Sequence, residues 1–278
     1  MNESLKNKIV VITGGGGILC GEMAKALAAL GAKIAVLDLK KESADELADV
    51  INNSGGTAIG VAANVLDKEA LIVAHEEVLD KLGPCDILVN GAGGNHPKGT
   101  TSKEYLNLDD IDDDNLISFF DLDPKGVEFV FNLNFLGTLL PTQIFSRDML
   151  GKDGCSVINI SSMNAFTPLT KIPAYSGAKA AVSNFTQWLA VHFSKVNIRV
   201  NALAPGFFLT DQNRKLLTQE DGSLTPRGNQ IISQTPMGRF GNPEDLISTL
   251  LWLCDPASSF VTGVVIPIDG GFSAYSGV

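Results

Sequence analysis

Short apolar runs and longer amphipathic stretches alternate along the chain, and this alternation predicts how the backbone is built. Runs rich in β-branched residues predict strands at 8–13, 33–38, 57–64, 85–90, 155–162, 198–205 and 263–269. Apolar residues at helical spacing predict helices at 42–53, 67–82, 127–149, 175–193 and 243–254, with a further helix after the glycines at 14–17. Strands that alternate with helices imply parallel strands joined by right-handed crossovers. We therefore predict an α/β fold in which residues 1–278 form a single domain, with one Rossmann-type, doubly wound parallel sheet of about seven strands and helices on both faces.

Two long segments interrupt this alternation, at 94–127 and at 207–240. Connections of this length inside a compact domain are usually functional, and loops at the carboxyl edge of a parallel sheet often contact substrate. We expect both segments to form the substrate region, the second as a lid. The acidic run at 109–114 has the alternating aspartates of a calcium loop but lacks its glycine and terminal glutamate, so we interpret it as a solvated acidic face.

The glycines at 14–17 stand between the first predicted strand and its helix. Glycines let a backbone approach a pyrophosphate, and a helix N-terminus offers unpaired N–H groups and a partial positive charge. A strand, a glycine turn and a helix are typical of the first half of a dinucleotide-binding unit. G-x-G-x-x-G fits at no register, and a simple tight turn is the alternative.

Asp38 ends the second predicted strand. An acidic residue about 20 residues after the glycine turn bonds the adenosine ribose hydroxyls of NAD and excludes a 2′-phosphate. The alternative is that Asp38 caps the helix at 42–53. Lys40 and Lys41 keep NADP open as a second cofactor.

Ser162, Tyr175 and Lys179 are the candidate catalytic residues. Ser162 ends a predicted buried strand, at the sheet edge where ligands bind in open α/β folds. Tyr175 and Lys179 share one helix face, and an ammonium beside a phenol favours the phenolate and lowers its pKa. The tyrosine could then act as an acid or base, although such a pair is also common on helix surfaces. Asn134, inside an apolar helix, is either a satisfied core polar group or part of a relay.

Composition narrows the function classes. The chain has 278 residues, 45% hydrophobic and 19% charged, which is typical of globular proteins, and its net charge of −10 argues against nucleic acid. No apolar run is long enough to cross a membrane and the N-terminus lacks a signal peptide, so we predict a cytoplasmic protein without membrane contact. Four dispersed cysteines and three dispersed histidines predict neither a metal site nor a disulfide framework.

Taken together, these motifs resemble the short-chain dehydrogenase/reductase family over nearly the whole chain. The matching residues are Thr13-Gly14, Asp38, Asn90-Gly91-Ala92-Gly93, Asn134, Ser162, Tyr175, Lys179, Asn201, Pro205-Gly206 and Asp269-Gly270-Gly271. The chain departs from the family in two places. Ile18 and Cys20 stand where its TGxxxGxG motif usually has glycines, and the segment at 94–127 is longer than is typical.

The resemblance implies an enzyme with NAD(H) as cofactor. Tyr175 would be the general acid/base, Ser162 would hold the substrate oxygen, Lys179 would lower the tyrosine pKa and bind the nicotinamide ribose, and Asn134 would hold a water of the relay. Beside Tyr175 and Lys179, cofactor contacts are implied at Gly14, Gly17, Leu19, Asp38, Asn64, Asn90, Ala92, Gly93, Pro205, Gly206, Phe208 and Thr210. The family also implies a homotetramer.

Within the family, several stretches resemble the D-mannonate oxidoreductase (fructuronate reductase) branch, among them GGGGILC, GGNHPKGTT, FFLTDQNR, LTPRGNQII and GGFSAYSGV. This resemblance implies a sugar-acid substrate, with NADH reducing the ketone of D-fructuronate to give D-mannonate. Its carboxylate needs a charge-assisted partner, for which Arg214, Arg227 and His96 are candidates. The alternatives are another sugar or polyol dehydrogenase, such as one like gluconate 5-dehydrogenase, and a non-catalytic NAD-binding sensor.

Overall fold

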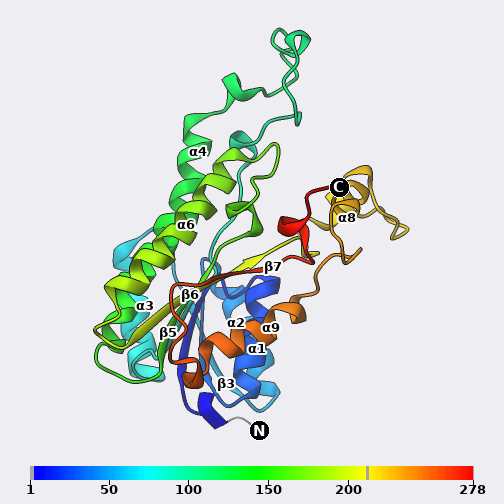
Figure 1. The fold of residues 1–278 in the computed structure, drawn as a ribbon. Helices are drawn as coiled ribbons and strands as arrows, with labels where there is room; N and C mark the ends of the chain where they lie inside the picture. The colour runs from blue at the N-terminus through cyan, green and yellow to red at the C-terminus, as the bar shows by residue number, and fades with distance from the viewer. Residues whose placement is uncertain (1–2, 211–212, 278) are drawn as a thin grey trace.

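A computed structural model describes residues 3–210 and 213–277, and within them one parallel sheet organises the chain. The order of the seven strands is β3-β2-β1-β4-β5-β6-β7 (Figure 1). The strands are β1 (Ile9–Thr13), β2 (Lys33–Asp38), β3 (Thr57–Ala62), β4 (Ile87–Asn90), β5 (Cys155–Ile160), β6 (Ile198–Pro205) and β7 (Val265–Ile268). The order reverses between β1 and β4, and ligands bind at such a switch point in α/β sheets. The predicted fold class is confirmed.

Helices cover both faces of the sheet. They are α1 (Ile18–Ala29), α2 (Lys41–Asn53), α3 (Lys68–Lys81), α4 (Pro124–Phe131), α5 (Gly137–Phe145), α6 (Pro173–His192), α7 (Arg214–Leu217), α8 (Pro226–Ser233) and α9 (Ile247–Cys254). One apolar core packs α1, α2 and α9 against the sheet through residues such as Met23 and Leu250. A second core, with Leu71, Phe145 and Leu189, packs α3, α5 and α6 on the opposite face (Figure 1).

The burial of the strands explains their composition. Every residue of β1 and β6 is buried, because helices lie on both sides of these strands. Strands buried on both faces are usually nearly continuous runs of Val, Ile and Leu, which is the pattern of β1, whereas β6 also buries Arg199 and Asn201. Strand β7 lies at the sheet edge, pairs with β6, and is only partly buried.

The prediction of one regular helix at 127–149 is wrong in the middle of this range. Between α4 and α5 the residues Asn132–Leu136 form a π-helical stretch, and Asn134 lies buried inside it. The amide of Asn134 donates to the carbonyl oxygens of Val130 and Gly94 at 2.7 and 2.8 Å. A π-helical stretch of this kind often marks a functional site, since it redirects a side chain without ending the helix.

The segment at 94–127 projects from the sheet body as an arm (Figure 1). The arm folds back on itself where the Ser102 N–H donates to the Ile117 oxygen at 2.8 Å. Its acidic run is exposed as predicted except at Asp110, which is buried, pairs with Lys103 and accepts from the Asn107 N–H at 3.0 Å.

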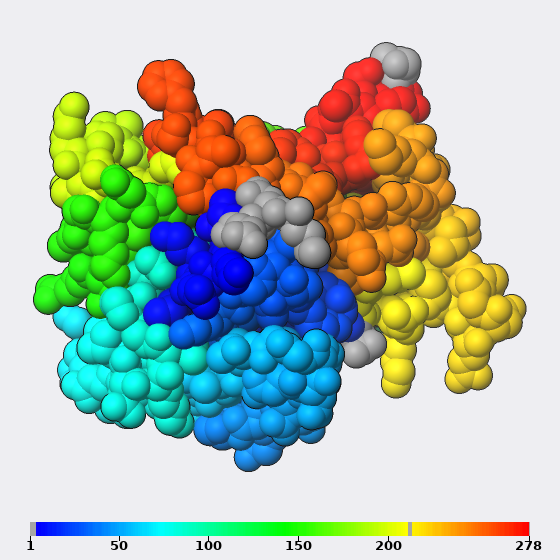
Figure 2. All heavy atoms as spheres, turned by 90° about the horizontal axis from the view of Figure 1, so that it is seen from below, coloured from blue at the N-terminus to red at the C-terminus, as the bar shows by residue number. Residues whose placement is uncertain are grey.

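The segment at 207–240 contains α7 and α8. Seen from below, its yellow residues stand out from the body beside the blue residues of the N-terminal half (Figure 2). Among the residues that the structure describes, no helix is both long and apolar enough to cross a bilayer.

Candidate active site

Two glycine turns meet at the switch point of the sheet. Gly14 has a φ of +64°, and a Cβ on it would lie 2.9 Å from the Ala92 backbone, so only glycine fits. The Thr13 hydroxyl accepts from the N–H groups of Gly91 and Ala92 at 3.1 and 3.2 Å. The turn after β1 is thereby fixed to the turn after β4.

Cys20 fills the space that a glycine leaves in the other turn. A Cβ on Gly91 would lie 2.2 Å from Cys20 Sγ, so the thiol packs directly against the glycine backbone. Cys20 is buried, and this burial raises the pKa of its thiol to about 12. Cys20, which stands where the family motif usually has a glycine, is therefore a packing residue.

A cleft of about 460 Å³ opens above these turns. Eight of the predicted cofactor residues line it: Gly14, Gly17, Leu19, Asp38, Asn64, Ala92, Gly93 and Thr210. The lining residues that the sequence reasoning missed are Gly16, Ile18, Cys20, Leu39, Ala63, Val65, Gly91 and Leu133. Most of these residues are next to predicted positions at strand ends, so they could have been predicted from the same signal. Leu133, from the π-helical stretch, had no signal in the sequence.

The cleft has the features that a dinucleotide needs. Gly17 is the N-cap of α1 and makes no side-chain cap, so the first N–H groups of this helix can meet a phosphate. Asp38 lies at the other end, where its Oδ2 accepts from the Gly16 N–H at 3.1 Å and its Oδ1 from the Lys40 N–H at 3.0 Å. The N-cap of α2 is Lys40, which excludes the capping alternative for Asp38. Lys41 is paired with Asp45, which leaves it poorly placed for a 2′-phosphate.

Six predicted cofactor residues do not line this cleft: Tyr175 and Lys179, which are described with the catalytic residues below, and four others. Asn90 is buried and donates to Thr142 Oγ1 and Asn159 Oδ1 at 2.8 and 2.9 Å. Gly206 packs against Asp269, while Phe208 is buried against Gly241. The fourth, Pro205, ends β6.

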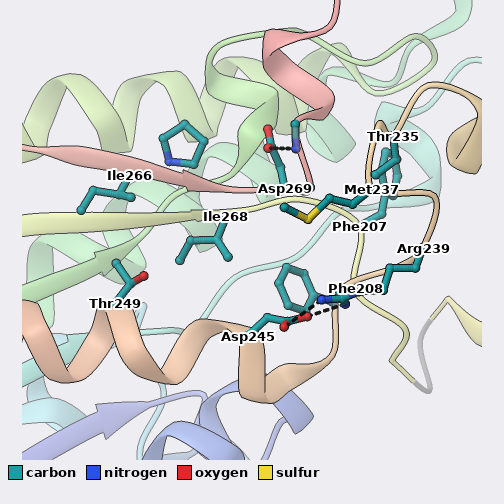
Figure 3. A pocket seen from close by; sticks show the side chains of 14 residues that line it. Phe207, Phe208, Thr235, Met237, Arg239, Asp245, Thr249, Ile266, Ile268 and Asp269 are labelled. Carbon is teal, nitrogen blue, oxygen red and sulfur yellow. Dashed lines mark hydrogen bonds and ion pairs between the residues drawn. The ribbon is translucent and has the colours of Figure 1, made fainter.

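Phe208 instead lines a second cavity of about 420 Å³, beside β7. Figure 3 shows its apolar wall, with Phe207 and Ile268, and the ion pair of Arg239 with Asp245 at its edge. The two nitrogens of Arg239 donate to the carboxylate at 2.6 and 3.0 Å. None of the candidate catalytic residues lines this cavity.

The structure brings the catalytic candidates together at the carboxyl end of β5. Ser162 follows this strand, α6 carries Tyr175 and Lys179, and Ser162 lies close enough to the Tyr175 phenol to lower its pKa. Lys179 Nζ donates to the Ile160 oxygen at 2.7 Å and lies 5.7 Å from the centre of the Tyr175 ring. A Cβ on Gly93 would lie 3.1 Å from Lys179 Nζ, so the amine adjoins a residue of the cofactor cleft.

Burial dominates the electrostatics of this group. It raises the pKa of the Tyr175 phenol above its ordinary value, and the nearby Ser162 opposes this shift only in part. Burial also lowers the pKa of Lys179 to about 8, against an ordinary value of 10.5. The predicted lowering of the tyrosine pKa by Lys179 is therefore wrong for the protein alone, because desolvation disfavours the charged form of each group.

Asn134 faces the same region from the helix side. Its Nδ2 donates to the Gly94 oxygen and its Oδ1 accepts from the Gly94 N–H at 3.3 Å. Asn134 is thus a satisfied buried amide that holds the turn after β4 in place. Its part in a proton relay stays a prediction.

The predicted substrate residues do not converge on one point. His96 caps a short helical turn, with Nδ1 accepting from the Lys98 N–H at 3.2 Å, and its ring lies 5.2 Å from that of Phe129. Arg214 begins α7 and is exposed. The guanidinium of Arg227 is paired with Glu104.

The family model described as short chain dehydrogenase matches residues 8–221. The chain belongs to the short-chain dehydrogenase family. An uncharacterized oxidoreductase of Haemophilus influenzae is 59% identical over 278 residues, which is 100% of this chain and 97% of the relative. The uncharacterized oxidoreductase UxuB of Bacillus subtilis is 50% identical over 280 residues, covering 100% of this chain and 99% of its own.

Solved structures of the short-chain dehydrogenase family extend the comparison. A candidate D-mannonate oxidoreductase from Haemophilus, crystallised with bound NAD, has a TM-score of 0.95 and 59% identity, covering 100% of this chain and 99% of its own. A 7α-hydroxysteroid dehydrogenase complexed with NADH and 7-oxo glycochenodeoxycholic acid has a TM-score of 0.82 and 28% identity, covering 98% and 97%. The predictions of an oxidoreductase and of NAD(H) as cofactor agree with both.

Proposed function

We propose that this protein is an NAD(H)-dependent oxidoreductase that interconverts the ketone of D-fructuronate and the secondary alcohol of D-mannonate. The observation that carries the chemistry is the meeting of Ser162, Tyr175 and Lys179 beside the glycine-lined cleft. The substrate is supported by 59% identity over the full chain to the NAD-bound structure named as a candidate D-mannonate oxidoreductase.

Each catalytic residue has a defined task in this reaction. The nicotinamide of the bound cofactor supplies or accepts the hydride. Ser162 holds the carbonyl oxygen by a hydrogen bond, and Tyr175, which keeps its proton because burial raises its pKa, donates that proton to the oxygen. Lys179, with a pKa of about 8, is mostly an ammonium at neutral pH and would hold the ribose of the bound cofactor.

The two long segments, within one domain, form the substrate region in this proposal. We favour Arg214 of the two candidate arginines for the sugar-acid carboxylate, because it is exposed and lies four residues after Thr210, which lines the cofactor cleft. Arg227 already holds a carboxylate of the protein. Arg214→Ala should raise the KM for D-fructuronate at least about tenfold, since a charge-assisted bond is lost. The KM for an uncharged ketose should not change, and an unchanged KM for D-fructuronate would place the carboxylate partner elsewhere.

The test of the function is a substrate panel. NADH oxidation is followed with keto-uronates and with neutral ketoses, and NADPH serves as the cofactor control. The proposal expects turnover with D-fructuronate and NADH, and a much lower rate with the neutral analogues. A site that is built to pair a carboxylate discriminates against an analogue that lacks one. A preference for neutral ketoses or polyols would favour the alternative of another sugar dehydrogenase.

The homotetramer stays a proposal from the family, with support from the surface. Exposed aromatic side chains gather on α4 and α6, among them Phe129, Phe131 and Trp188. The rings of Phe185, Trp188 and His192 stack along α6. Apolar patches of this kind mark protein interfaces, and edge strand β7 offers a second surface. Light scattering coupled to size-exclusion chromatography gives the number of subunits, and a monomer would refute the proposal.

A further inference from the structure

The segments at 94–127 and 207–240 are joined through the carboxylate of Glu104. Arg227 Nη1 donates to Glu104 Oε1 at 3.0 Å. Gln230, on the same helix α8, donates from Nε2 to Oε1 and Oε2 at 3.1 and 3.2 Å. The partners lie 123 and 126 positions from Glu104 in the sequence. The bond is therefore a tertiary link between the two segments of the proposed substrate region.

On its own side, Glu104 is anchored close to the catalytic tyrosine. The Thr101 N–H donates to the Lys171 oxygen at 2.8 Å. A Cβ on Gly99 would lie 3.4 Å from that of Ala174, so the base of the arm packs on the start of α6. Both contacted residues lie within four positions of Tyr175, so the base of the arm that carries Glu104 is fixed to the start of the catalytic helix.

On the other side, α8 is anchored to the cofactor cleft. The Thr225 side chain caps α8, and its backbone N–H donates to the Leu217 oxygen at 3.0 Å, which ties α8 to α7. The first residue of α7, Arg214, donates from its N–H to Thr210 of the cleft. Glu104 thus links an element positioned by the catalytic helix to one positioned by the cofactor site.

The surroundings of Glu104 and Arg227 make their ion pair stronger than an ordinary surface ion pair. The side chains of Glu104 and Arg227 are 23% and 32% exposed, so solvent and salt screen them less than a fully exposed pair. Two donors from one helix also share one carboxylate, which restricts the direction of α8 more than a single contact does.

We propose that Glu104 is a positioning residue for substrate: it holds α8 against the arm, and this link sets the affinity for the sugar acid without touching the reacting atoms. The inference rests on the proposed function, because it assumes that both segments enclose the substrate. A merely structural ion pair would change stability and leave the KM as it is.

Steady-state kinetics test the link. Glu104→Gln should raise the KM for D-fructuronate roughly three- to tenfold, while kcat changes less than about twofold and NADH binds as before. Combining Glu104→Arg with Arg227→Glu should restore part of the lost affinity, which neither single change does. The matched control is Glu128→Gln, which removes the same charge from an exposed residue of α4 and should leave KM unchanged. An unchanged KM in Glu104→Gln, or a loss confined to kcat, would overturn the proposal.

Hydrogen exchange gives a second readout that needs no substrate. The amides of 227–233 should exchange faster in Glu104→Gln than in the wild-type protein, and those of α1 should not change. Equal exchange in α8 would refute the link itself. Faster exchange in a protein that does not turn over D-fructuronate would locate the failure in the proposed substrate and uphold the link.

Discussion

The part of this protein that forms the proposed cofactor cleft (the cofactor half) and the two inserted segments that we propose bind substrate (the substrate half) are built in different ways. The cofactor cleft consists of backbone at strand ends, where β1 pairs with β4 in a fixed register and the two glycine turns pack on one another. The substrate region consists of two inserted segments joined by side chains, among which Glu104 and Arg227 form one ion pair.

This difference separates chemistry from substrate choice. The backbone of the cofactor cleft changes only when the sheet changes, since each turn is held by strand pairing and by close packing. A region joined by a few side chains can be altered by single substitutions without disturbing the sheet. We therefore expect substitutions in the cofactor half to affect binding of NADH or turnover, and those in the substrate half to affect mainly the KM for the sugar acid.

The largest effect is expected at Tyr175. Tyr175→Phe keeps the ring but removes the proton donor, so kcat should fall about 10²- to 10⁴-fold. The dissociation constant for NADH, measured by fluorescence titration, should stay within about twofold of the wild-type value because the cleft is unchanged. Turnover at the wild-type rate would exclude Tyr175 as the proton donor and with it the proposed mechanism.

Asp38 should show the next largest effect, on cofactor choice alone. Removing a charged acceptor costs about 1.5–3 kcal/mol, so Asp38→Ala should raise the KM for NADH at least about tenfold. The ratio of NADPH to NADH activity should rise, since the carboxylate no longer repels a 2′-phosphate. The KM for the sugar acid is the internal control, and a change confined to it would show that the two halves are not independent.

Gly91 tests whether close backbone packing forms the cleft. The added methyl of Gly91→Ala would lie 2.2 Å from Cys20 Sγ, so the free energy of unfolding should fall by about 1–3 kcal/mol and NADH binding should weaken. Gly94→Ala is the matched control, because its methyl would meet Leu133 at an ordinary 3.7 Å. Chemical denaturation of both variants measures the difference, and equal stability would contradict the packing argument.

The smallest effect is a pH dependence from Lys179. Its folded pKa of about 8 lies below the ordinary 10.5, so the unfolded chain binds the extra proton between these values and folding gains stability as pH rises. Between pH 8 and 9.5 the wild-type protein should gain about 1.5 kcal/mol relative to Lys179→Met. The Cys20 thiol, with a pKa of about 12, stays protonated in the folded protein over this range, and its titration in the unfolded chain is common to both proteins, so the difference between denaturation curves isolates the lysine. A constant difference would mean that Lys179 is not desolvated.

The cofactor half was largely predictable because its signals are local. Strand ends follow from hydrophobic runs, and glycines or Asp38 directly after them mark the edge where a ligand binds. The substrate half was not predictable in the same way. No periodicity connects Glu104 with Arg227, because their contact depends on how two inserted segments fold back over the sheet.

Two features of the candidate catalytic residues also could not be predicted from the sequence. The π-helical stretch around Asn134 arises from the hydrogen bonds of its amide with Gly94, a contact across 40 positions of the chain. The raised pKa of Tyr175 depends on how much water its surroundings exclude, whereas the sequence indicates only which charged residue is its helical neighbour.

The hydrogen bonds of Thr13 with the turn after β4 also bear on how the chain folds. They join residues 78 and 79 positions apart, and β4 must pair with β1 before they can form. Closing a loop of that length costs conformational entropy that local helix formation does not, so such contacts come late. During synthesis, the first glycine turn leaves the ribosome well before its partner. The nascent chain therefore acquires its cofactor site only after the second turn has been made and docked, and NADH added to a refolding reaction would select molecules that have completed this step.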